Sequence, residues 1–567
     1  MRRSLQMAGM PAFSLDLSVA APVLSLRGMP LSSRIRSSLV ATRWPSCSSR
    51  LAVTVLVLVY LGLAVYLSRV LNTWDDETAY VALGRLAATG AISLFQDDMT
   101  GQRMPLPYYV EGASQVIFGR NLWAARLLSV GIGIGALLLT VDIARRLGGD
   151  LAGALAGLLL ATQGVVVGYY ATATYFALTA TIVMAAVWVL LREELPARHA
   201  LGMAVASLLF FTRTNMFPAL PFFFAWALLG AGGAFERLMV VVVAAAPPAI
   251  FFFSDPTHLK LLAHVPVLNH LVTSLDYRSI LSFSAVNHAG FGQQLWALVV
   301  IARRYESWTL AAAGLALVAA LLRVHGRPLA SVPFRRGVTA VAFLWVWLFV
   351  WHLVIWRISF RYVLPYVATF APLAAVVFGV VFATLLARED LPRAARSVLT
   401  LTLAGALTLS VVFIRHPVLA SPVPRPFDRD PIQLLDRVAV DLRTLVPAGE
   451  KVFLFGPPMA PYLAGLDAPA QQLMSPGGTL APAHADDRLI SKNGVWGRKE
   501  LERWLGRDLR YAVISPFALQ ETESLRPEAV NHIRELLRER FMLVGQVGEG
   551  PLLALDVYRR TDKRTIK

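Results

Sequence analysis

Cysteine is almost absent from this chain of 567 residues, because Cys47 is the only one. No disulfide can form within the chain, so any part that faces an oxidising compartment must be stabilised by its own apolar core. Charged residues are also scarce, at 16%, whereas hydrophobic residues make up 56% and the mean hydropathy is +0.57. These values lie outside the range of ordinary soluble domains and indicate a membrane protein with several spans.

Other signatures are missing too, and each absence excludes or disfavours a class of function. The sequence contains no glycine-rich phosphate loop and no ligand spacing typical of zinc. His258, His264 and His270 recur at intervals of six, whereas metal ligands on a helix prefer three or four, so a hydrated loop is expected there. No internal repeat is found, which disfavours the repeated halves of a transporter. The net charge of +17 is explained by basic loops at anionic lipid and does not require nucleic acid.

Long apolar runs are what the sequence does contain. Residues 51–71 have no charge before Arg69, and their length matches the roughly 20 residues that cross a bilayer core. Ten further spans are expected, for a total of about eleven, at residues 123–143, 151–169, 172–191, 200–213, 216–231, 237–253, 307–322, 338–356, 363–386 and 397–414. The span at 200–213 is short, so we expect it either to tilt or to form a broken pair with the next one across Arg213 and Asn215.

The distribution of arginine predicts the topology. Short alternate loops contain Arg145, Arg146, Arg192, Arg198, Arg237, Arg323, Arg327, Arg335, Arg336, Arg388, Arg393 and Arg396. Such loops are expected on the cytoplasmic side, which puts the loop at 72–121 and everything after 415 outside. Residues 1–50 contain seven arginines and a single acid, Asp16, and are interpreted as a disordered basic cytoplasmic tail rather than a cleaved signal peptide. Residues 51–415 form the predicted membrane domain.

Residues 416–567 differ in composition and predict a small extracytoplasmic α/β domain. Short apolar strands are expected at 451–455, 511–514, 541–544 and 552–557. Helical periodicity is found at 429–445 and 527–540. About 150 residues are enough to bury a separate core.

Three consecutive acids, Asp75, Asp76 and Glu77, follow the first apolar run and open the loop at 72–121. Carboxylates just outside a membrane helix are costly unless they have a function, although Asp75 could also serve as a helix cap. Residues 80–88 have helical spacing and are predicted to lie along the membrane surface. The prolines from Pro105 then turn the chain back toward the bilayer.

Several motifs occur in an order and spacing that together are fairly specific. They are Asp76-Glu77-x-x-Tyr80, Pro105-Leu106 before Tyr108, Phe118-Gly119-x-Asn121-x-x-x-Ala125-Arg126, Ala144-Arg145-Arg146-Leu147-Gly148-Gly149 and Phe360-Arg361-Tyr362-x-x-Pro365. On these residues nearly the whole chain resembles the C-type membrane glycosyltransferases, in particular glycosyltransferase family 39 around the protein O-mannosyltransferases and the lipid A aminoarabinose transferases.

The resemblance implies a mainly α, polytopic helical bundle with a C-terminal α/β domain in the bacterial inner membrane. It implies transfer of a sugar from a polyprenyl-phosphate donor to an acceptor hydroxyl of a glycan, lipid or protein on the outer face. Such a displacement needs a base for the acceptor proton, and Asp76 is the first candidate, with Asp75 as its substitute. Glu77 would orient the acceptor or the base.

The departing lipid phosphate requires fixed cations near the membrane surface. The candidates are Arg361, Arg103, Arg357 and Arg213, although arginines near span ends also snorkel to the interface. Asp97, Asp98, Tyr80 and Tyr362 are assigned to acceptor binding or support.

Two departures from the aminoarabinose transferases leave the substrate open. Arg103 and Met104 replace an acid and a lysine, and residues 169–175 replace an early Arg-x-Asp by Tyr, Ala and Thr. Sugar and acceptor are therefore not assigned, no cofactor is assigned, and a divalent metal stays an open alternative. A transporter or flippase of lipid-linked sugars and a non-catalytic envelope assembly protein are the alternative functions.

Overall fold

The structure is a computed structural model, and part of the chain is described by it. The described residues are 47–73, 75–94, 104–254, 332–352, 360–387, 430–474, 480–481, 496–550 and 553–561, with short or single positions at 292, 296, 397, 415–416 and 421–422. The spans predicted at 307–322 and 397–414 fall almost entirely outside these residues. The total of eleven spans therefore stays a prediction.

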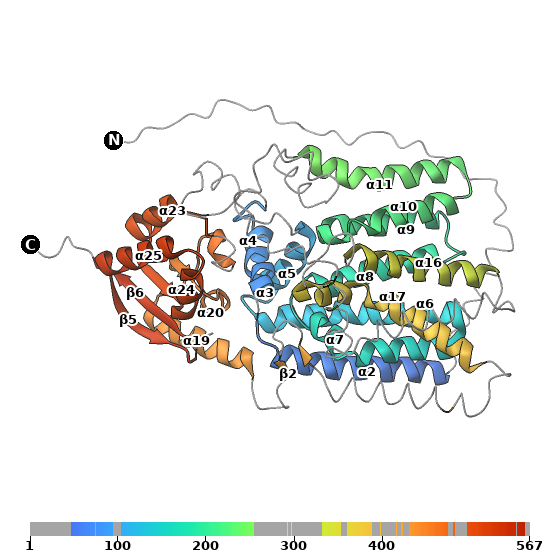
Figure 1. The fold of residues 1–567 in the computed structure, drawn as a ribbon, viewed down its shortest axis with the longest axis horizontal. Helices are drawn as coiled ribbons and strands as arrows, with labels where there is room; N and C mark the ends of the chain where they lie inside the picture. The colour runs from blue at the N-terminus through green and yellow to red at the C-terminus, as the bar shows by residue number, and fades with distance from the viewer. Residues whose placement is uncertain are drawn as a thin grey trace, which may run out of the picture. The chain divides into compact units, whose positions relative to one another are not determined.

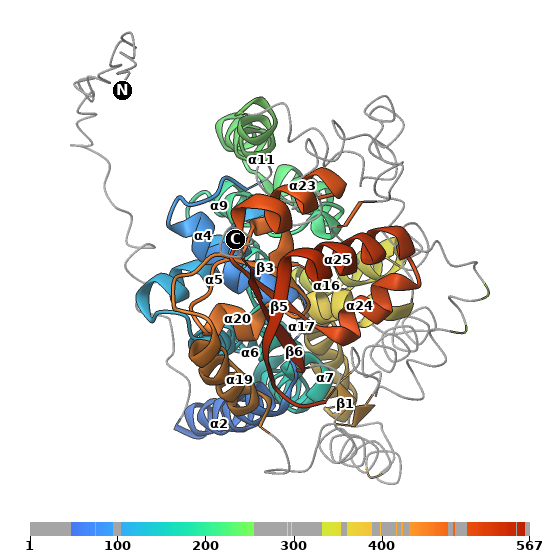
Figure 2. The same ribbon diagram turned by 90° about the vertical axis from the view of Figure 1, so that its left-hand side faces the viewer.

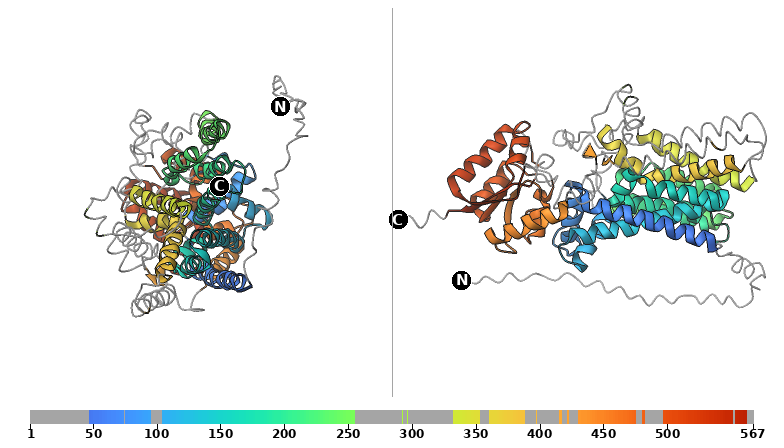
Figure 3. Two further views of the ribbon diagram at one scale, coloured as in Figure 1. Left: turned by 90° about the vertical axis from the view of Figure 1, so that its right-hand side faces the viewer. Right: turned by 90° about the horizontal axis from the view of Figure 1, so that it is seen from below.

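The described membrane helices follow the predicted apolar runs, and the left view of Figure 3 looks along them. They are α2 (Cys47–Val70), α6 (Leu122–Thr162), α7 (Gly164–Tyr170), α8 (Tyr175–Leu190), α9 (Arg198–Ser207), α10 (Ala219–Gly230), α11 (Ala234–Ser254), α16 (Val332–Val350) and α17 (Phe360–Leu386). Among the described residues, four helices are long and apolar enough to cross a membrane, or five if the bent pair α7–α8 is one span. The protein is an integral membrane protein.

Helix α6 contains the predicted span at 123–143 and most of the one at 151–169, because the chain reverses within it. Gly149 adopts φ 82° and ψ 179°, a conformation that favours glycine. After this turn, the position of a Cβ on Gly153 would lie 2.9 Å from the carbonyl oxygen of Val141, so the two arms run side by side. Helix α6 and the adjoining helices α2, α8 and α17 pack together into the bundle core.

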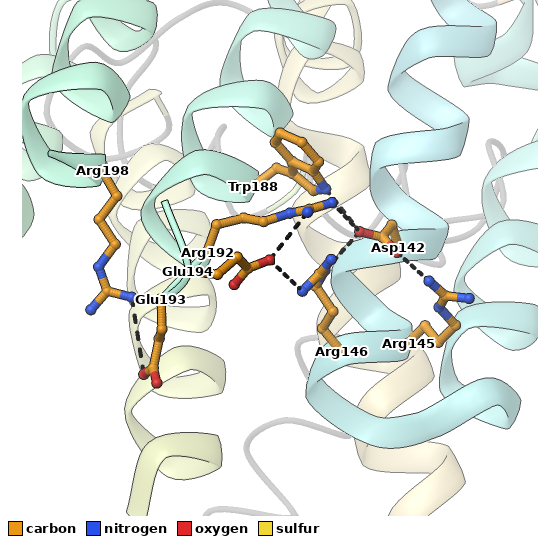
Figure 4. Close-up of polar contacts among 8 residues, drawn as sticks. All are labelled: Asp142, Arg145, Arg146, Trp188, Arg192, Glu193, Glu194 and Arg198. Atoms are coloured by element: carbon orange, nitrogen blue, oxygen red, sulfur yellow. Dashed lines mark hydrogen bonds and ion pairs between the residues drawn. The ribbon is translucent and has the colours of Figure 1, made fainter. Parts of the chain in front are cut away.

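A charged cluster joins α6 and α8 beside this reversal (Figure 4). Asp142 accepts hydrogen bonds from Arg145, Arg146 and the Trp188 indole at 2.7–2.8 Å. Arg192 lies 3.6 Å from the same carboxylate and stacks 3.9 Å above the Trp188 ring. Three of the arginines that predict the cytoplasmic side, Arg145, Arg146 and Arg192, thus contact one acid, which ties the ends of two spans together.

The short span at 200–213 has the broken form. Helix α9 ends at Ser207 and continues as the 3-10 turn η2 (Leu208–Phe211), and a second 3-10 turn, η3 (Thr214–Met216), precedes α10. Between the two turns Arg213 is extended, with φ −168°. The interruption occurs at the two residues, Arg213 and Asn215, where the sequence predicts it.

The loop after the first span folds into α3 (Asp75–Thr78), the π-helical turn η1 (Ala79–Leu83), α4 (Gly84–Ala88) and α5 (Pro105–Ile117). The helix predicted at 80–88 is present, but the five residues of η1 are fully buried in the protein rather than lying on its surface. The reason is a close crossing of α4 and α5, in which a Cβ on Gly112 would collide with the Gly84 carbonyl group. Helix α3 begins at Asp75 itself.

The C-terminal part forms a four-stranded sheet of order β3-β4-β6-β5, seen in Figure 2. Its elements are α19 (Pro431–Leu445), β3 (Val452–Phe455), α20 (Met459–Leu463), η7 (Ala470–Leu473), α23 (Arg498–Arg503), η8 (Trp504–Asp508), β4 (Tyr511–Ile514), α24 (Pro516–Glu523), α25 (Pro527–Arg540), β5 (Phe541–Val547) and β6 (Leu555–Arg560). The strands β3 and β4 are parallel, and the other two pairs are antiparallel. A two-residue pair, β1 (Arg415–His416) and β2 (Ser421–Pro422), precedes the sheet.

The two faces of this sheet belong to different cores. Alternate residues of β3 separate, because Val452 and Leu454 pack with α19 whereas Phe453 and Phe455 pack with α25. The α19 side is continuous with the apolar core of the membrane helices. One face of the sheet thus shares the core of the membrane helices, whereas the other face has a core of its own, and Figure 1 shows the C-terminal part beside α3 to α5.

Candidate functional site

Asp76 and Arg213 meet although 137 positions separate them in the chain. Asp76 lies in α3, directly after the first span, and Arg213 lies in the break before α10. The Arg213 Nη1 atom is 3.6 Å from Asp76 Oδ2. The Asp76 side chain is 26% exposed and that of Arg213 is 9% exposed, so this acid can reach a ligand from a partly sheltered position.

Tyrosines surround the Arg213 guanidinium. Its Nη1 donates to the hydroxyl of Tyr80 at 3.3 Å, and its Cζ lies 4.3 Å from the centre of the Tyr175 ring and 5.7 Å from that of Tyr366. Tyr80 in turn packs at 4.8 Å against Tyr108 of α5. Aromatic faces attract a guanidinium, so these rings fix the cation close to Asp76.

Glu77 forms a fully buried ion pair with Arg126. The Arg126 Nε and Nη2 atoms donate to Glu77 Oε1 and Oε2 at 2.8 and 2.7 Å, a bidentate geometry, and both side chains are 0% exposed. Arg126 Nη1 also donates to the carbonyl oxygens of Ser68 and Leu71 at the end of α2. One guanidinium thus links the first span to the turn that contains Asp76.

The same carboxylate is bound to the turn between α7 and α8. The backbone N–H of Ala173 donates to Glu77 Oε1 at 2.8 Å. Both carboxylate oxygens of Glu77 already accept hydrogen bonds from within the protein. Glu77 can therefore orient α3, the helix that contains Asp76. This turn lies within residues 169–175, the segment in which the resemblance leads one to expect Arg-x-Asp, and here the hydroxyls of Thr172 and Thr174 lie 3.2 Å apart.

Glu111 is a second buried acid, on α5. Its Oε1 accepts from the Ser129 hydroxyl at 2.7 Å, and its Oε2 has no hydrogen-bond partner among the described residues. Burial raises the pKa of Glu111 to about 8, and the nearby Glu77 carboxylate adds to the rise, whereas the Ser129 hydrogen bond opposes it. Glu111 is therefore mostly neutral at pH 7.

The structure brings together three of the predicted site residues: Asp76, Tyr80 and Arg213. Glu77 is adjacent but faces Arg126. Asp75 is the first residue of α3, and Arg361 and Tyr362 lie in the first turn of α17, but the side chains of these three are outside the described part. The other predicted residues lie outside the described residues altogether, namely Arg103, Arg357, Asp97 and Asp98.

Four further residues belong to this site and are not assigned by the sequence. Arg126 ends the motif that begins at Phe118, and Tyr175 ends the segment 169–175 that departs from the aminoarabinose transferases. The sequence therefore contains a signal for both residues. Tyr366 follows the Pro365 motif by one position. The sequence gives the least indication for Glu111, since a single acidic residue in a loop is not expected to be buried. Among the described residues, no group of three His, Cys, Asp or Glu side chains could hold a metal ion.

The fold is similar to that of solved membrane glycosyltransferases, whereas no protein-family model and no curated protein sequence matches the chain. ArnT from Cupriavidus metallidurans, solved with undecaprenyl phosphate, has a TM-score of 0.51 and 13% identity over 90% of this chain and 98% of its own. The Archaeoglobus fulgidus oligosaccharyltransferase in its apo form gives a TM-score of 0.49 and 12% identity over 93% of this chain and 76% of its own. The assignment of the fold rests on the first of these. The chain has the fold of the C-type membrane glycosyltransferases, a mainly α membrane bundle with a C-terminal α/β domain.

Proposed function

We propose that this protein transfers a sugar from a polyprenyl-phosphate donor to an acceptor hydroxyl. The observation that supports this best is the approach of Arg213 to Asp76 at 3.6 Å, beside the end of the first span. A general base and a phosphate-binding cation are the two groups that the displacement needs. The undecaprenyl phosphate bound to the similar ArnT structure supports the donor class.

In the proposed reaction, Asp76 accepts the proton of the acceptor hydroxyl as its oxygen attacks the anomeric carbon. The bond from that carbon to the phosphate oxygen breaks, and the lipid phosphate leaves with both electrons. Arg213 meets the charge that develops on this phosphate, in a position that Tyr80 and Tyr175 define. A direct displacement of this kind inverts the anomeric centre.

Several predicted parts of the mechanism extend this proposal. Arg361, Arg103 and Arg357 are further candidates for the phosphate, and Asp75 is the substitute base. Asp97, Asp98 and Tyr362 are proposed to support the acceptor. The reaction is proposed for the outer face of the bacterial inner membrane, with the first 50 residues in the cytoplasm.

The test is transfer by the purified protein in lipid vesicles. A panel of polyprenyl-phosphate sugars labelled in the sugar is supplied with glycan, lipid and peptide acceptors, and both labelled product and free polyprenyl phosphate are measured. Equal amounts of the two are expected. Passage of the intact donor across the vesicle membrane without its cleavage would instead favour a flippase.

A further inference from the structure

Two side chains, Trp347 in helix α16 and His352 two residues after its end, contact the interrupted segment that contains Arg213. The Trp347 indole donates to the carbonyl oxygen of Pro218 at 2.7 Å, just before α10. One turn further along, the ring of His352 faces Asn215, with 3.5 Å between His352 Nε2 and Asn215 Nδ2. Since η2 and η3 are short 3-10 turns, side chains from other helices must define the course of this segment.

The hydrogen-bond partners of His352 determine which of its ring nitrogens carries the hydrogen. Its Nδ1 lies 2.6 Å from the Leu348 carbonyl oxygen, which can only accept, so Nδ1 bears the hydrogen. In the neutral imidazole Nε2 is then the acceptor, and Nδ2 of the Asn215 side chain can donate to it. Both side chains are 1% exposed, so this contact is shielded from water.

The same imidazole packs on Tyr366, one of the rings beside the Arg213 guanidinium. Its ring centre lies 5.5 Å from that of Tyr366, the tyrosine whose ring is 5.7 Å from the Arg213 guanidinium. Asn215 lies in η3, two residues after Arg213, and the Tyr366 ring flanks the Arg213 guanidinium. His352 therefore touches a side chain of this turn and a ring beside the cation.

We propose that His352 is a positioning residue for Arg213, which it holds at the distance from Asp76 that a donor phosphate requires. This inference rests on the proposed function, in which Arg213 binds the phosphate. A purely apolar ring at this position would fill the same space and pack on Tyr366, but it would release Asn215. The hydrogen bond, rather than the volume, is therefore the part of His352 that the proposal requires.

The test compares His352→Phe with Trp345→Phe, a matched change of a fully buried aromatic side chain in α16, the helix that His352 follows. Binding of a short-chain polyprenyl phosphate to the full-length protein in detergent is measured by its thermal stabilisation. We expect about a tenfold loss of affinity in His352→Phe and none in Trp345→Phe. In an Arg213→Ala background, His352→Phe should cause no further loss, because its effect acts through that guanidinium. Wild-type affinity in His352→Phe, or an equal loss in both backgrounds, would overturn the inference.

A second readout separates this inference from the proposed function. If the wild type binds no polyprenyl phosphate, the proposed function fails, and the structure of His352→Phe by electron cryomicroscopy decides the inference alone. Displacement of the Arg213 guanidinium from Asp76 beyond salt-bridge distance supports it. An unchanged separation of these two groups would overturn it.

Discussion

Glu77 and Arg126 form a bidentate ion pair with no exposure to solvent, and this pair joins α3 to the end of the first span. Removing one partner leaves the other charge buried and unpaired, which costs about 3–5 kcal/mol in comparable cases. Glu77 also follows Asp76 directly in α3. Its loss should therefore affect both stability and the geometry of the site.

The first prediction concerns this pair. Glu77→Gln is expected to lower the thermal unfolding temperature strongly and to reduce sugar transfer, because the carboxylate that holds Arg126 and the Ala173 N–H is lost. The matched control is Glu502→Gln, whose partner Arg498 is 78% exposed, and surface pairs contribute only about 0–1 kcal/mol. Thermal melting in detergent measures both variants. Equal small shifts would show that the buried pair is dispensable.

The second prediction concerns the buried acid Glu111, whose pKa in the folded protein is about 8. At pH values between 4.5, the ordinary pKa of a glutamate, and about 8, the folded state binds more protons than the unfolded state. The stability of the folded state therefore falls as the pH rises through this range. Its contribution is expected to be lost progressively from about pH 5 to pH 8.

Glu111→Gln should remove this slope, because the amide does not ionise and can still accept from Ser129. Melting temperatures from pH 5 to pH 8.5 for both proteins test this expectation. A wild-type stability that rises over the same interval, or a slope that persists unchanged in the variant, would contradict the buried neutral state of Glu111.

The third prediction concerns the junction with the C-terminal domain. Arg120 donates to the carbonyl oxygens of Tyr462 and Leu466 and to Asp467, and the Tyr462 hydroxyl donates to Gln115 at 3.1 Å. Arg120→Ala should increase hydrogen exchange in α20 by at least tenfold, since several charge-assisted hydrogen bonds are lost together. The partly exposed Arg503, paired with Asp508 inside the C-terminal domain, supplies the control substitution. Unchanged exchange in α20 would indicate that other contacts hold the junction.

Much of the fold follows from local sequence patterns. The apolar runs predict the described membrane helices, and the interruption at Arg213 and Asn215 follows from a run too short to span. The strands near Val452, Tyr511, Phe541 and Leu555 are predicted within a few residues, because their periodicity is local. The burial of η1 is not predicted, since it depends on the crossing of Gly84 with Gly112, a contact between distant segments.

The site is predictable only in part, for a similar reason. Asp76 and Arg213 are found separately, one by its position after a span and the other by its charge within one. Their proximity, and the role of Arg126 in holding Glu77, depend on the packing of α3, α6 and the α7–α8 turn. A motif identifies such residues without indicating which of them face substrate and which face one another.

The central claim is that Asp76 is the general base, and one comparison tests it most directly. Sugar transfer and polyprenyl-phosphate binding are measured for the wild type, Asp76→Asn and Asp75→Asn at matched expression. Loss of a general base lowers rates by roughly a hundredfold to ten-thousandfold. We expect that loss in Asp76→Asn alone, with binding of the lipid phosphate preserved, because Arg213 remains in position. Full transfer by Asp76→Asn would contradict the account.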